Sequence, residues 1–284
     1  MKSLNKFSCY CNYSIPANTF LTDLTYQPRN EILTVSFDHL IFLTTLDISG
    51  NVNVLSINLP NLKILWCCDT KLSYFDHLTT LKKLYCDGCP VEKICLPNLE
   101  ILHCNRTKIK DFSKLLNLKE LYCIEFSGRK IKNKLLKKLF CRGAENLLSI
   151  EAPNLLTLDC SFSKIKKIEA PKLKYLNCSN SNMNFFDHFT TLETLECSHC
   201  DIRYINLPNL KTLDCSNTKV ENLDHLNLIY LECKHCPVKS INIPSLREVY
   251  CDYTELDNVL SKSKDWIKYD KNKLPGVMYA YYRV

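Results

Sequence analysis

A six-residue phrase, Leu-x-x-Leu-x-Cys, recurs at a nearly constant interval along most of this 284-residue chain. Its last residue, here called the anchor, falls at Cys67, Cys86, Cys104, Cys123, Cys141, Cys160, Cys178, Cys197, Cys215, Cys233 and Cys251. An earlier copy ends in Ile48, and from there successive anchors are 18 or 19 residues apart. A fixed period of this kind indicates a solenoid, in which each repeat is one coil stacked on its neighbours. The sequence therefore predicts one elongated body.

Each repeat divides into a short strand and a return segment. Apolar residues alternate with a period of 2 around the second leucine, so Leu65 is expected to point inward while Ile64 and Trp66 point outward. The remaining residues, about eight, are too few for an α-helix with two turns. We therefore predict a mostly β solenoid, of α/β type, with extended or 3₁₀ returns.

The returns are of two kinds. One kind ends in proline directly before the next strand, as at Pro60 and Pro208, where a residue without an amide hydrogen suits a bend. The other kind contains an Asp-His pair, at Asp38-His39, Asp76-His77, Asp187-His188 and Asp224-His225. The aspartate of each pair is interpreted as the N-cap of a single helical turn.

Residues 210–220, Leu-Lys-Thr-Leu-Asp-Cys-Ser-Asn-Thr-Lys-Val, resemble the leucine-rich repeat consensus Leu-x-x-Leu-x-Leu-x-x-Asn/Cys-x-Leu. The period is shorter than the family's usual roughly 20–29 residues and is similar to the short repeats of bacterial effectors. Cysteine-rich versions resemble leucine-rich repeat proteins of giant DNA viruses. The resemblance implies an arc with a concave parallel sheet and convex returns, and it implies binding to other proteins. Thr, Ser or Cys mostly fills the Asn/Cys slot, where hydroxyl and thiol groups partly replace the family's asparagine ladder.

The period sets the expected domain organisation. Residues 1–42 are predicted to be an N-terminal cap, residues 43–256 about 12 repeats, irregular at 124–150, and residues 257–284 a C-terminal cap. The irregular stretch keeps Leu136, Leu139 and Cys141 in register, so it is interpreted as a modified repeat rather than a domain break.

Cysteine usage bears on the compartment. The N-terminus has no apolar run typical of a signal peptide, and no segment is long and apolar enough to span a bilayer. The 18 cysteines are therefore expected to be thiols in a reducing compartment. We predict a cytoplasmic protein, in the host cytoplasm if viral, that is not secreted.

Two chemical alternatives involve these cysteines. The motifs ending at Cys200 and Cys236 are Cys-x-x-Cys pairs of the kind that hold zinc, but buried packing of small thiols explains the same positions and is favoured. His precedes Cys at Cys104, Cys200 and Cys236, yet neighbours on a strand face opposite ways and a buried thiol gives no reason for a lowered pKa. No metal, cofactor or catalytic residue is expected.

The outward residue just before each anchor forms a row along the predicted concave face. The first half of this row is aromatic and the second half mostly acidic, ending in a tyrosine: Trp66, Tyr85, His103, Tyr122 and Phe140, then Asp159, Asn177, Glu196, Asp214 and Glu232, and then Tyr250. Contiguous exposed aromatic residues are typical of binding surfaces. Stacked acids suit a basic partner, although Asp at this position is also common in the family's repeats. We predict partner binding through the aromatic residues first and the acids second.

The formal charge of +7 is concentrated in residues 129–142, which hold seven basic residues and no acid. This stretch suits a solvated back of a modified repeat, a phosphate-binding patch or a membrane-surface element. The first interpretation is favoured because Leu135, Leu136 and Leu139 are already needed for the core. Neither a nucleic acid nor a membrane is expected as a partner.

The resulting hypothesis is a non-enzymatic, monomeric scaffold that binds a protein partner through its concave sheet. The alternative is the substrate-recognition part of an effector enzyme of the ubiquitin-ligase kind. That alternative needs a separate catalytic domain, for which the 33 residues after Cys251 are too few. A zinc-binding protein is a third hypothesis.

Overall fold

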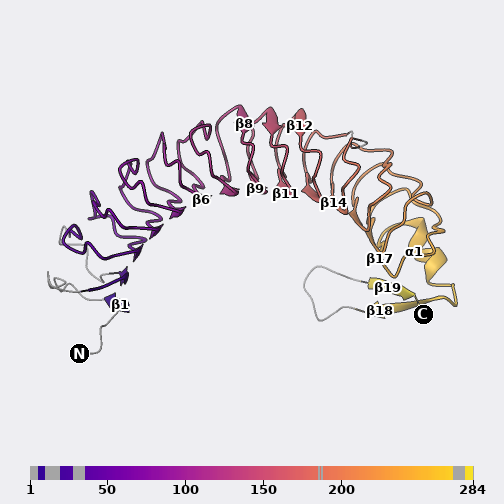
Figure 1. Cartoon of the computed structure of the whole chain (residues 1–284). Helices are drawn as coiled ribbons and strands as arrows, with labels where there is room; N and C mark the ends of the chain where they lie inside the picture. The colour runs from indigo at the N-terminus through magenta and orange to yellow at the C-terminus, as the bar shows by residue number, and fades with distance from the viewer. Residues whose placement is uncertain are drawn as a thin grey trace. The chain divides into compact units, whose positions relative to one another are not determined.

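The computed structural model describes residues 6–9, 20–27, 36–184, 186, 188–270 and 279–283. In these residues short strands recur once per repeat and a single α-helix follows the last repeat (Figure 1). The chain divides into two compact units, Met1–Ala152 (unit 1) and Pro153–Val284 (unit 2), with the boundary just after the irregular stretch. Each unit is a mostly β solenoid with its parallel strands on the concave side, which confirms the predicted fold class.

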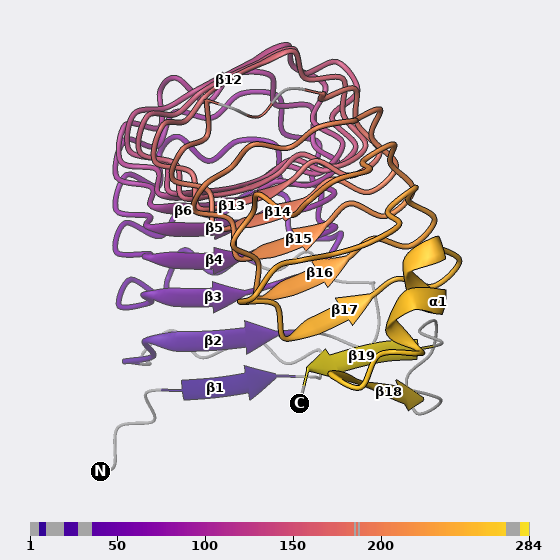
Figure 2. The same ribbon diagram turned by 90° about the vertical axis from the view of Figure 1, so that its right-hand side faces the viewer.

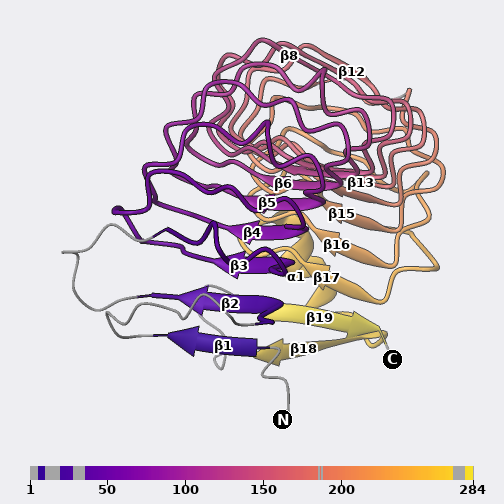
Figure 3. The ribbon, with the colours of Figure 1, turned by 60° about the vertical axis from the view of Figure 1, so that its left-hand side comes forward.

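In its described residues, unit 1 contains eight strands in one parallel sheet and two short strands in its returns. The sheet strands are β1 (Lys6–Cys9), β2 (Asp23–Tyr26), β3 (Thr45–Asp47), β4 (Ile64–Trp66), β5 (Lys83–Tyr85), β6 (Ile101–His103), β7 (Glu120–Tyr122) and β9 (Lys138–Phe140). The return strands β8 (Lys130–Lys132) and β10 (Ser149–Glu151) pair in parallel with each other. Figure 3 shows β1 to β6 lying in sequence order.

Unit 2 continues the pattern and ends differently. Its parallel strands are β11 (Thr157–Asp159), β13 (Tyr175–Asn177), β14 (Thr194–Glu196), β15 (Thr212–Asp214), β16 (Tyr230–Glu232) and β17 (Glu248–Tyr250), and β12 (Lys167–Glu169) lies in a return. After β17 come α1 (Glu255–Leu260), β18 (Trp266–Asp270) and β19 (Tyr279–Arg283). β19 pairs antiparallel with β17 and with β18, as Figure 2 shows.

The register keeps equivalent residues of successive coils side by side. Leu65 pairs with Leu84, and Leu84 pairs with Leu102, so the second leucines form one continuous buried row. Almost every repeat strand has a buried middle residue between two partly exposed ones, which confirms the predicted alternation. In unit 1, β2 joins the same register through Leu24 and Leu46. The predicted cap boundaries at residues 42 and 257 stay a prediction, because parts of both caps lie outside the described residues.

The eleven anchor cysteines all lie in the core. Each is at most 3% exposed, and all sixteen cysteines of the described residues whose state is assigned are free thiols. The residues in the Asn/Cys slot donate hydrogen bonds to the backbone carbonyls of anchor cysteines in two ways. The hydroxyls of Thr70 and Thr218 donate to their own coil's anchor, at 2.9 and 2.6 Å, whereas the Cys89 thiol donates to the carbonyl of Cys67 in the preceding coil, at 3.0 Å. Hydroxyl and thiol groups therefore form a partial replacement for an asparagine ladder, as expected.

The returns are extended segments with hydrogen-bonded turns, and their Asp-His pairs are not N-caps. Asp76 Oδ1 accepts a hydrogen bond at 2.7 Å from the backbone N–H of Cys95, one coil further on. The neighbouring His77 Nε2 lies 2.5 Å from the carbonyl oxygen of Ile57, one coil back. The pair therefore links three consecutive coils, which corrects the sequence interpretation. Asp224 and His225 make the same two links in unit 2, at 2.6 Å each, whereas Asp187 lies outside the described residues.

Every coil turns through the left-handed backbone region two residues after its anchor. Three of these twelve positions are glycine, at Gly50, Gly88 and Gly143. The other nine have positive φ without being glycine, from 55° to 62°: Asp69, Arg106, Glu125, Phe162, Asn180, His199, Asn217, His235 and Tyr253. Left-handed geometry disfavours residues with a Cβ by about 1–2 kcal/mol. The stacked coils impose this geometry because the turn must repeat in register.

Candidate functional site

The aromatic row of unit 1 forms one continuous stack of rings on the concave sheet. Strands β4, β5, β6, β7 and β9 each place their third residue in the row, and the register pairs these residues one to the next. Ring centroids are 5.1 Å apart for Trp66–Tyr85, 4.6 Å for Tyr85–His103, 3.9 Å for His103–Tyr122 and 4.6 Å for Tyr122–Phe140. The structure therefore brings together the five predicted aromatic residues, here called the ring stack.

Stacking determines which parts of these rings a partner can reach. The ring planes of Trp66 and Tyr85 are nearly parallel, at 9°, and so are those of Tyr122 and Phe140, at 8°. Most neighbouring rings stack face to face, although Tyr85 and His103 are tilted by 46°, and all five side chains are partly buried. Faces covered in this way leave the ring edges as the parts that a partner can contact. Ring edges carry the positive part of the aromatic quadrupole, which favours contact with carbonyl oxygens and with the faces of other rings.

His103 lies in the middle of the ring stack. Burial lowers the pKa of its imidazole below the ordinary value, and the nearby Asp87 and Glu120 carboxylates only partly offset this effect. His103 is therefore a neutral ring at neutral pH, which suits its stacking between Tyr85 and Tyr122.

Acidification should therefore lower the stability of unit 1 against unfolding, because it protonates His103. A histidine with a depressed folded-state pKa stabilises the fold above its unfolded pKa, and that stability is lost as the pH falls through the folded pKa. Urea unfolding should therefore show a loss of stability from this residue between pH 7.5 and 5. His103→Phe keeps a ring in the stack and should remove that part of the pH dependence. An unchanged pH dependence in the variant would contradict this assignment.

The charged residues beside the ring stack are largely paired. Lys138 Nζ lies 3.0 Å from Glu120 Oε1, and this carboxylate raises the pKa of Lys138.

In the basic stretch 129–142, Lys130 and Lys132 both pair with Glu151, at 2.9 and 2.5 Å. These ion pairs support the interpretation of the basic stretch as the solvated back of a modified repeat.

The acidic row of unit 2 lies on the corresponding strand positions, and its carboxylates already accept hydrogen bonds. Glu196 accepts from the Tyr175 hydroxyl and from the Asn177 amide, both at 2.8 Å. Asp214 accepts from the Ser198 hydroxyl at 2.5 Å and from the backbone N–H of Ser216 at 2.9 Å. Local donors thus offset much of the repulsion that stacked acids would otherwise produce.

The remaining members of the acidic row have their own partners. Asp159 Oδ1 accepts from the Ser161 hydroxyl at 2.8 Å, and Glu232 pairs with Lys234 at 2.8 Å. Burial raises the pKa of the Glu196 carboxyl, and the charges of Asp214, Asp159 and Glu232 raise it further. Each acid of the row therefore has at least one partner within the protein.

Tyr250 differs from the sequence expectation. It is only 4% exposed, and its hydroxyl donates to Glu248 Oε1 at 2.5 Å. Lys234 Nζ lies 5.8 Å from the ring centroid. Because β17 is the last strand of the repeat sheet and pairs with the antiparallel β19, its environment is unlike that of the other coils. Tyr250 therefore offers little surface to a partner.

The cysteine motifs show one departure from expectation. Cys200 in the Asn/Cys slot lies beside the anchor Cys178 of the preceding coil, and their hydrogen bond lowers the pKa of Cys200 to about 6. Cys89 and Cys236 are similarly lowered to about 7 by Cys67 and Cys215. The expectation that no thiol has a lowered pKa is therefore wrong for these three. All three are at most 4% exposed, which keeps them from acting as nucleophiles on an external substrate.

The described part of the chain contains neither a metal-binding cluster nor a membrane-spanning helix. No group of three or more His, Cys, Asp and Glu side chains there is arranged to hold a metal ion. Among the same residues, no helix has the length and apolar character that crossing a membrane requires.

Comparison with known proteins gives similarity in structure only. No family model matches the sequence, and no curated protein matches it. An internalin from Listeria monocytogenes, inlF, is 17% identical with a TM-score of 0.59, over 77% of this chain and 76% of that chain. The leucine-rich repeat domain of APL1B is 17% identical with a TM-score of 0.61, over 76% of each chain.

A third similar structure is part of an assembly. It is a chain from an octameric complex of Latrophilin 3, Unc5D and FLRT2, in which FLRT2 carries the leucine-rich repeats. It is 15% identical with a TM-score of 0.50, over 70% of this chain and 77% of that chain. At these identities the comparisons show the fold, and none of them indicates an enzyme family. The predicted resemblance to proteins of giant DNA viruses stays a prediction. The chain has the mostly β solenoid fold of leucine-rich repeat proteins.

Proposed function

We propose that this chain is a non-enzymatic scaffold that binds a protein partner through the concave sheet of unit 1, with the ring stack as the centre of the interface. The ring stack carries this proposal because it places five aromatic side chains in one row on the sheet, each only partly buried. Tyrosine and tryptophan are enriched among residues that dominate binding energies, since they bury much area with few rotatable bonds.

The similar structures support a role in protein association. One of them belongs to an octameric complex, in which the leucine-rich repeat protein is assembled with two other proteins. A substrate-recognition part of a larger effector enzyme would use the same surface, so it stays the alternative. Zinc analysis of the purified chain tests the third hypothesis, that of a metal-binding protein.

The acidic row is the second candidate surface, for a basic partner. Glu196 and its neighbours supply negative charge along successive strands of unit 2. We rank it below the ring stack because its carboxylates already accept hydrogen bonds from Ser161, Tyr175 and Ser198.

The proposal includes a cytoplasmic, reducing environment and a monomeric scaffold. Sixteen free thiols support the compartment, since an oxidising compartment favours disulfides.

The test replaces three rings, in the variant Trp66→Ala/Tyr85→Ala/Tyr122→Ala. Affinity purification from the native cell with mass spectrometry identifies partners of the wild type, and binding of each is then measured with purified proteins. Removing three central aromatic residues should lower the affinity for the true partner at least about 100-fold, since each such residue contributes about 2 kcal/mol or more to binding.

A matched control separates this effect from a general loss of apolar surface. Leu55, Tyr74 and Leu116 of unit 1 are 65%, 61% and 66% exposed and lie in returns rather than on the sheet. Leu55→Ala/Tyr74→Ala/Leu116→Ala should keep the partner. Circular dichroism checks that both variants are folded. If the ring-stack variant binds the same partners with unchanged affinity, the proposed site is wrong.

A further inference from the structure

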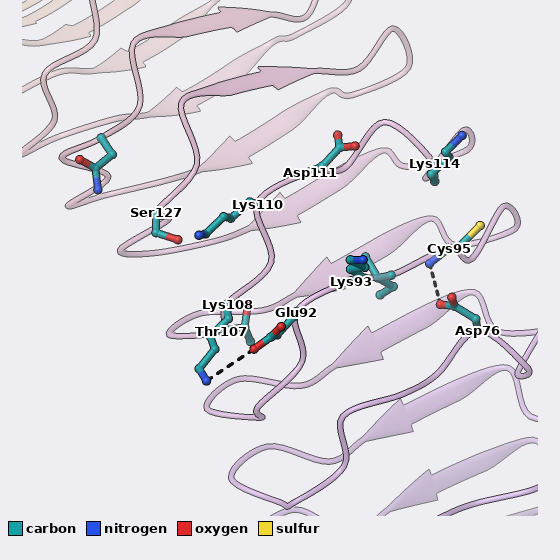
Figure 4. A pocket seen from close by; sticks show the side chains of 12 residues that line it. Asp76, Glu92, Lys93, Cys95, Thr107, Lys108, Lys110, Asp111, Lys114 and Ser127 are labelled. Atoms are coloured by element: carbon teal, nitrogen blue, oxygen red, sulfur yellow. Dashed lines mark hydrogen bonds and ion pairs between the residues drawn. The ribbon is translucent and has the colours of Figure 1, made fainter.

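The returns of unit 1 form a groove that the scaffold function does not use. Figure 4 shows its lining, which comes from five consecutive coils, from Asp76 on the first to Asn146 on the last. Its volume is about 1000 Å³, comparable with the upper end of the roughly 300–1000 Å³ typical of small-molecule sites. Four lysines and three acids line it, so its formal charge is only +1.

The three acids of the groove already have partners. Asp76 Oδ1 accepts from the backbone N–H of Cys95 at 2.7 Å. Glu92 pairs with Lys108 at 3.6 Å. Asp111 accepts from the backbone N–H and the hydroxyl of Ser113, at 2.9 and 2.7 Å. Each of the three acids therefore has at least one partner within the protein.

Apart from Lys108 and Thr107, the side-chain donors of the groove have no such partners. Lys93, Lys110 and Lys114 make no hydrogen bond or ion pair with any other residue that the structure describes, and the same holds for the side chains of Ser127 and Asn146. All five are exposed. They contrast with Lys130 and Lys132 of the basic stretch, which both pair with Glu151.

We propose that this groove, here called the lysine groove, binds a small molecule that carries two or more phosphoryl groups. Unpaired ammonium groups are point charges suited to phosphoryl oxygens, and hydroxyl and amide donors can complete such a site. Lys93 comes from one coil and Lys110 and Lys114 from the next, and Figure 4 shows the three spread across the groove. A ligand with separated anionic groups can therefore engage more of them than a single phosphate can.

Cys95 gives this proposal a local reporter. It lines the lysine groove, and it is exposed, whereas Cys68 is half-buried and the other cysteines of assigned state are buried. Tripolyphosphate should bind with an affinity measurable by calorimetry and should slow alkylation of Cys95 by N-ethylmaleimide, read by mass spectrometry of the peptide that contains it. Binding without protection of Cys95 would overturn the proposed location.

Two charge-matched variants complete the test. Lys93→Gln/Lys110→Gln/Lys114→Gln should weaken tripolyphosphate binding by about tenfold or more, since each exposed ion pair contributes up to about 1 kcal/mol. Lys71→Gln/Lys262→Gln/Lys264→Gln removes the same charge from exposed lysines outside the groove and should change the affinity less than about twofold. Equal weakening by the two variants would show general charge attraction and overturn the site.

Two further ligands test the chemistry. Orthophosphate should bind at least about tenfold more weakly than tripolyphosphate, because it engages fewer of the lysines. Citrate, a carboxylate anion, should also bind more weakly. Equal binding of orthophosphate would overturn the requirement for several phosphoryl groups, and equal binding of citrate would overturn the preference for phosphoryl groups. The ring-stack variant should bind tripolyphosphate normally, so failure here leaves the scaffold proposal standing.

Discussion

The free energy of unfolding should fall steeply as the pH rises above 9, because the anchor thiols are neutral in the fold and ionise when the chain unfolds. In unit 2 the pKa of all six anchor thiols is raised, and that of Cys251 reaches about 12. Burial is the main cause for five of them, whereas for Cys215 the hydrogen bond with Cys236 comes first. An unfolded cysteine ionises near pH 8.5–9.

The direction follows from proton linkage. A group with a raised folded-state pKa stabilises the fold below its unfolded pKa, and that stability is lost as the pH rises toward the folded pKa. Each such thiol contributes a loss of about 1.4 kcal/mol per pH unit above roughly pH 9. Six of them lower the stability of unit 2 by about 8 kcal/mol per pH unit, which rivals the total stability of about 5–15 kcal/mol of a typical domain. Cys200 and Cys236, whose pKa is lowered, add nothing to this slope.

Urea unfolding in the presence of a reductant, followed by circular dichroism from pH 7.5 to 10.5, measures this slope. The folded state should be lost near pH 10. Cys178→Ala removes one buried thiol and should reduce the slope by about 1.4 kcal/mol per pH unit. Cys95→Ala removes an exposed thiol and should leave the slope unchanged. Stability that is constant up to pH 10.5 would mean that the thiols are not buried in neutral form.

The period made the fold predictable from the sequence. A three-residue strand such as Ile64–Trp66 is too short to identify from propensity, but a dozen copies in register give the same burial pattern repeatedly. Equivalent positions of successive repeats fall in rows along the solenoid. This also predicted that the anchor thiols lie in the core and that the five aromatic residues form one row. Wherever a residue's environment repeats from coil to coil, its sequence position predicts its place.

The Asp-His pairs show where local interpretation fails. An aspartate before a short return looks like an N-cap, because capping signals are read within a few residues. In the structure, the partner of Asp76 is the backbone of Cys95, which is 19 residues away and one full period further along the chain. The recurrence of the pair at matching positions of different coils was the available signal for a contact between coils.

The left-handed turns were also missed. Gly50, Gly88 and Gly143 mark the position, as do Asn180 and Asn217, but Phe162 and Tyr253 do not suit it by propensity. The stack imposes the backbone geometry and the residue accommodates it. A glycine or asparagine two residues after nearly half of the anchors was the signal that could have revealed this turn.

The candidate sites could be predicted from the sequence only in part, for two physical reasons. Tyr250 follows the row in sequence, but β19 adds an antiparallel strand next to β17 and changes the surroundings of the last coil. The stretch 129–142 is the most basic in sequence, yet Lys130 and Lys132 are paired, whereas Lys93 and Lys110 are not. Ion pairing depends on which return faces which, and that arrangement cannot be read from composition.

Leu121→Ala should lower the free energy of unfolding by about 2–5 kcal/mol, because it opens a cavity that the surrounding coils cannot fill. Leu121 is the middle residue of β7, is fully buried, and pairs in register with Leu102 and Leu139. Leu116→Ala, five residues away, makes the same change at a side chain that is 66% exposed, so it should shift stability by less than about 0.5 kcal/mol.

Urea unfolding at pH 7.5 compares the two variants, and equal losses would contradict the assignment of the leucine row to the core. The stacked design adds a second expectation. Each coil contacts only its neighbours, so a weakened central coil reduces the coupling between the coils on its two sides. The Leu121→Ala variant should therefore unfold over a broader range of urea than the Leu116→Ala variant, as coils on one side of the cavity lose structure before those on the other.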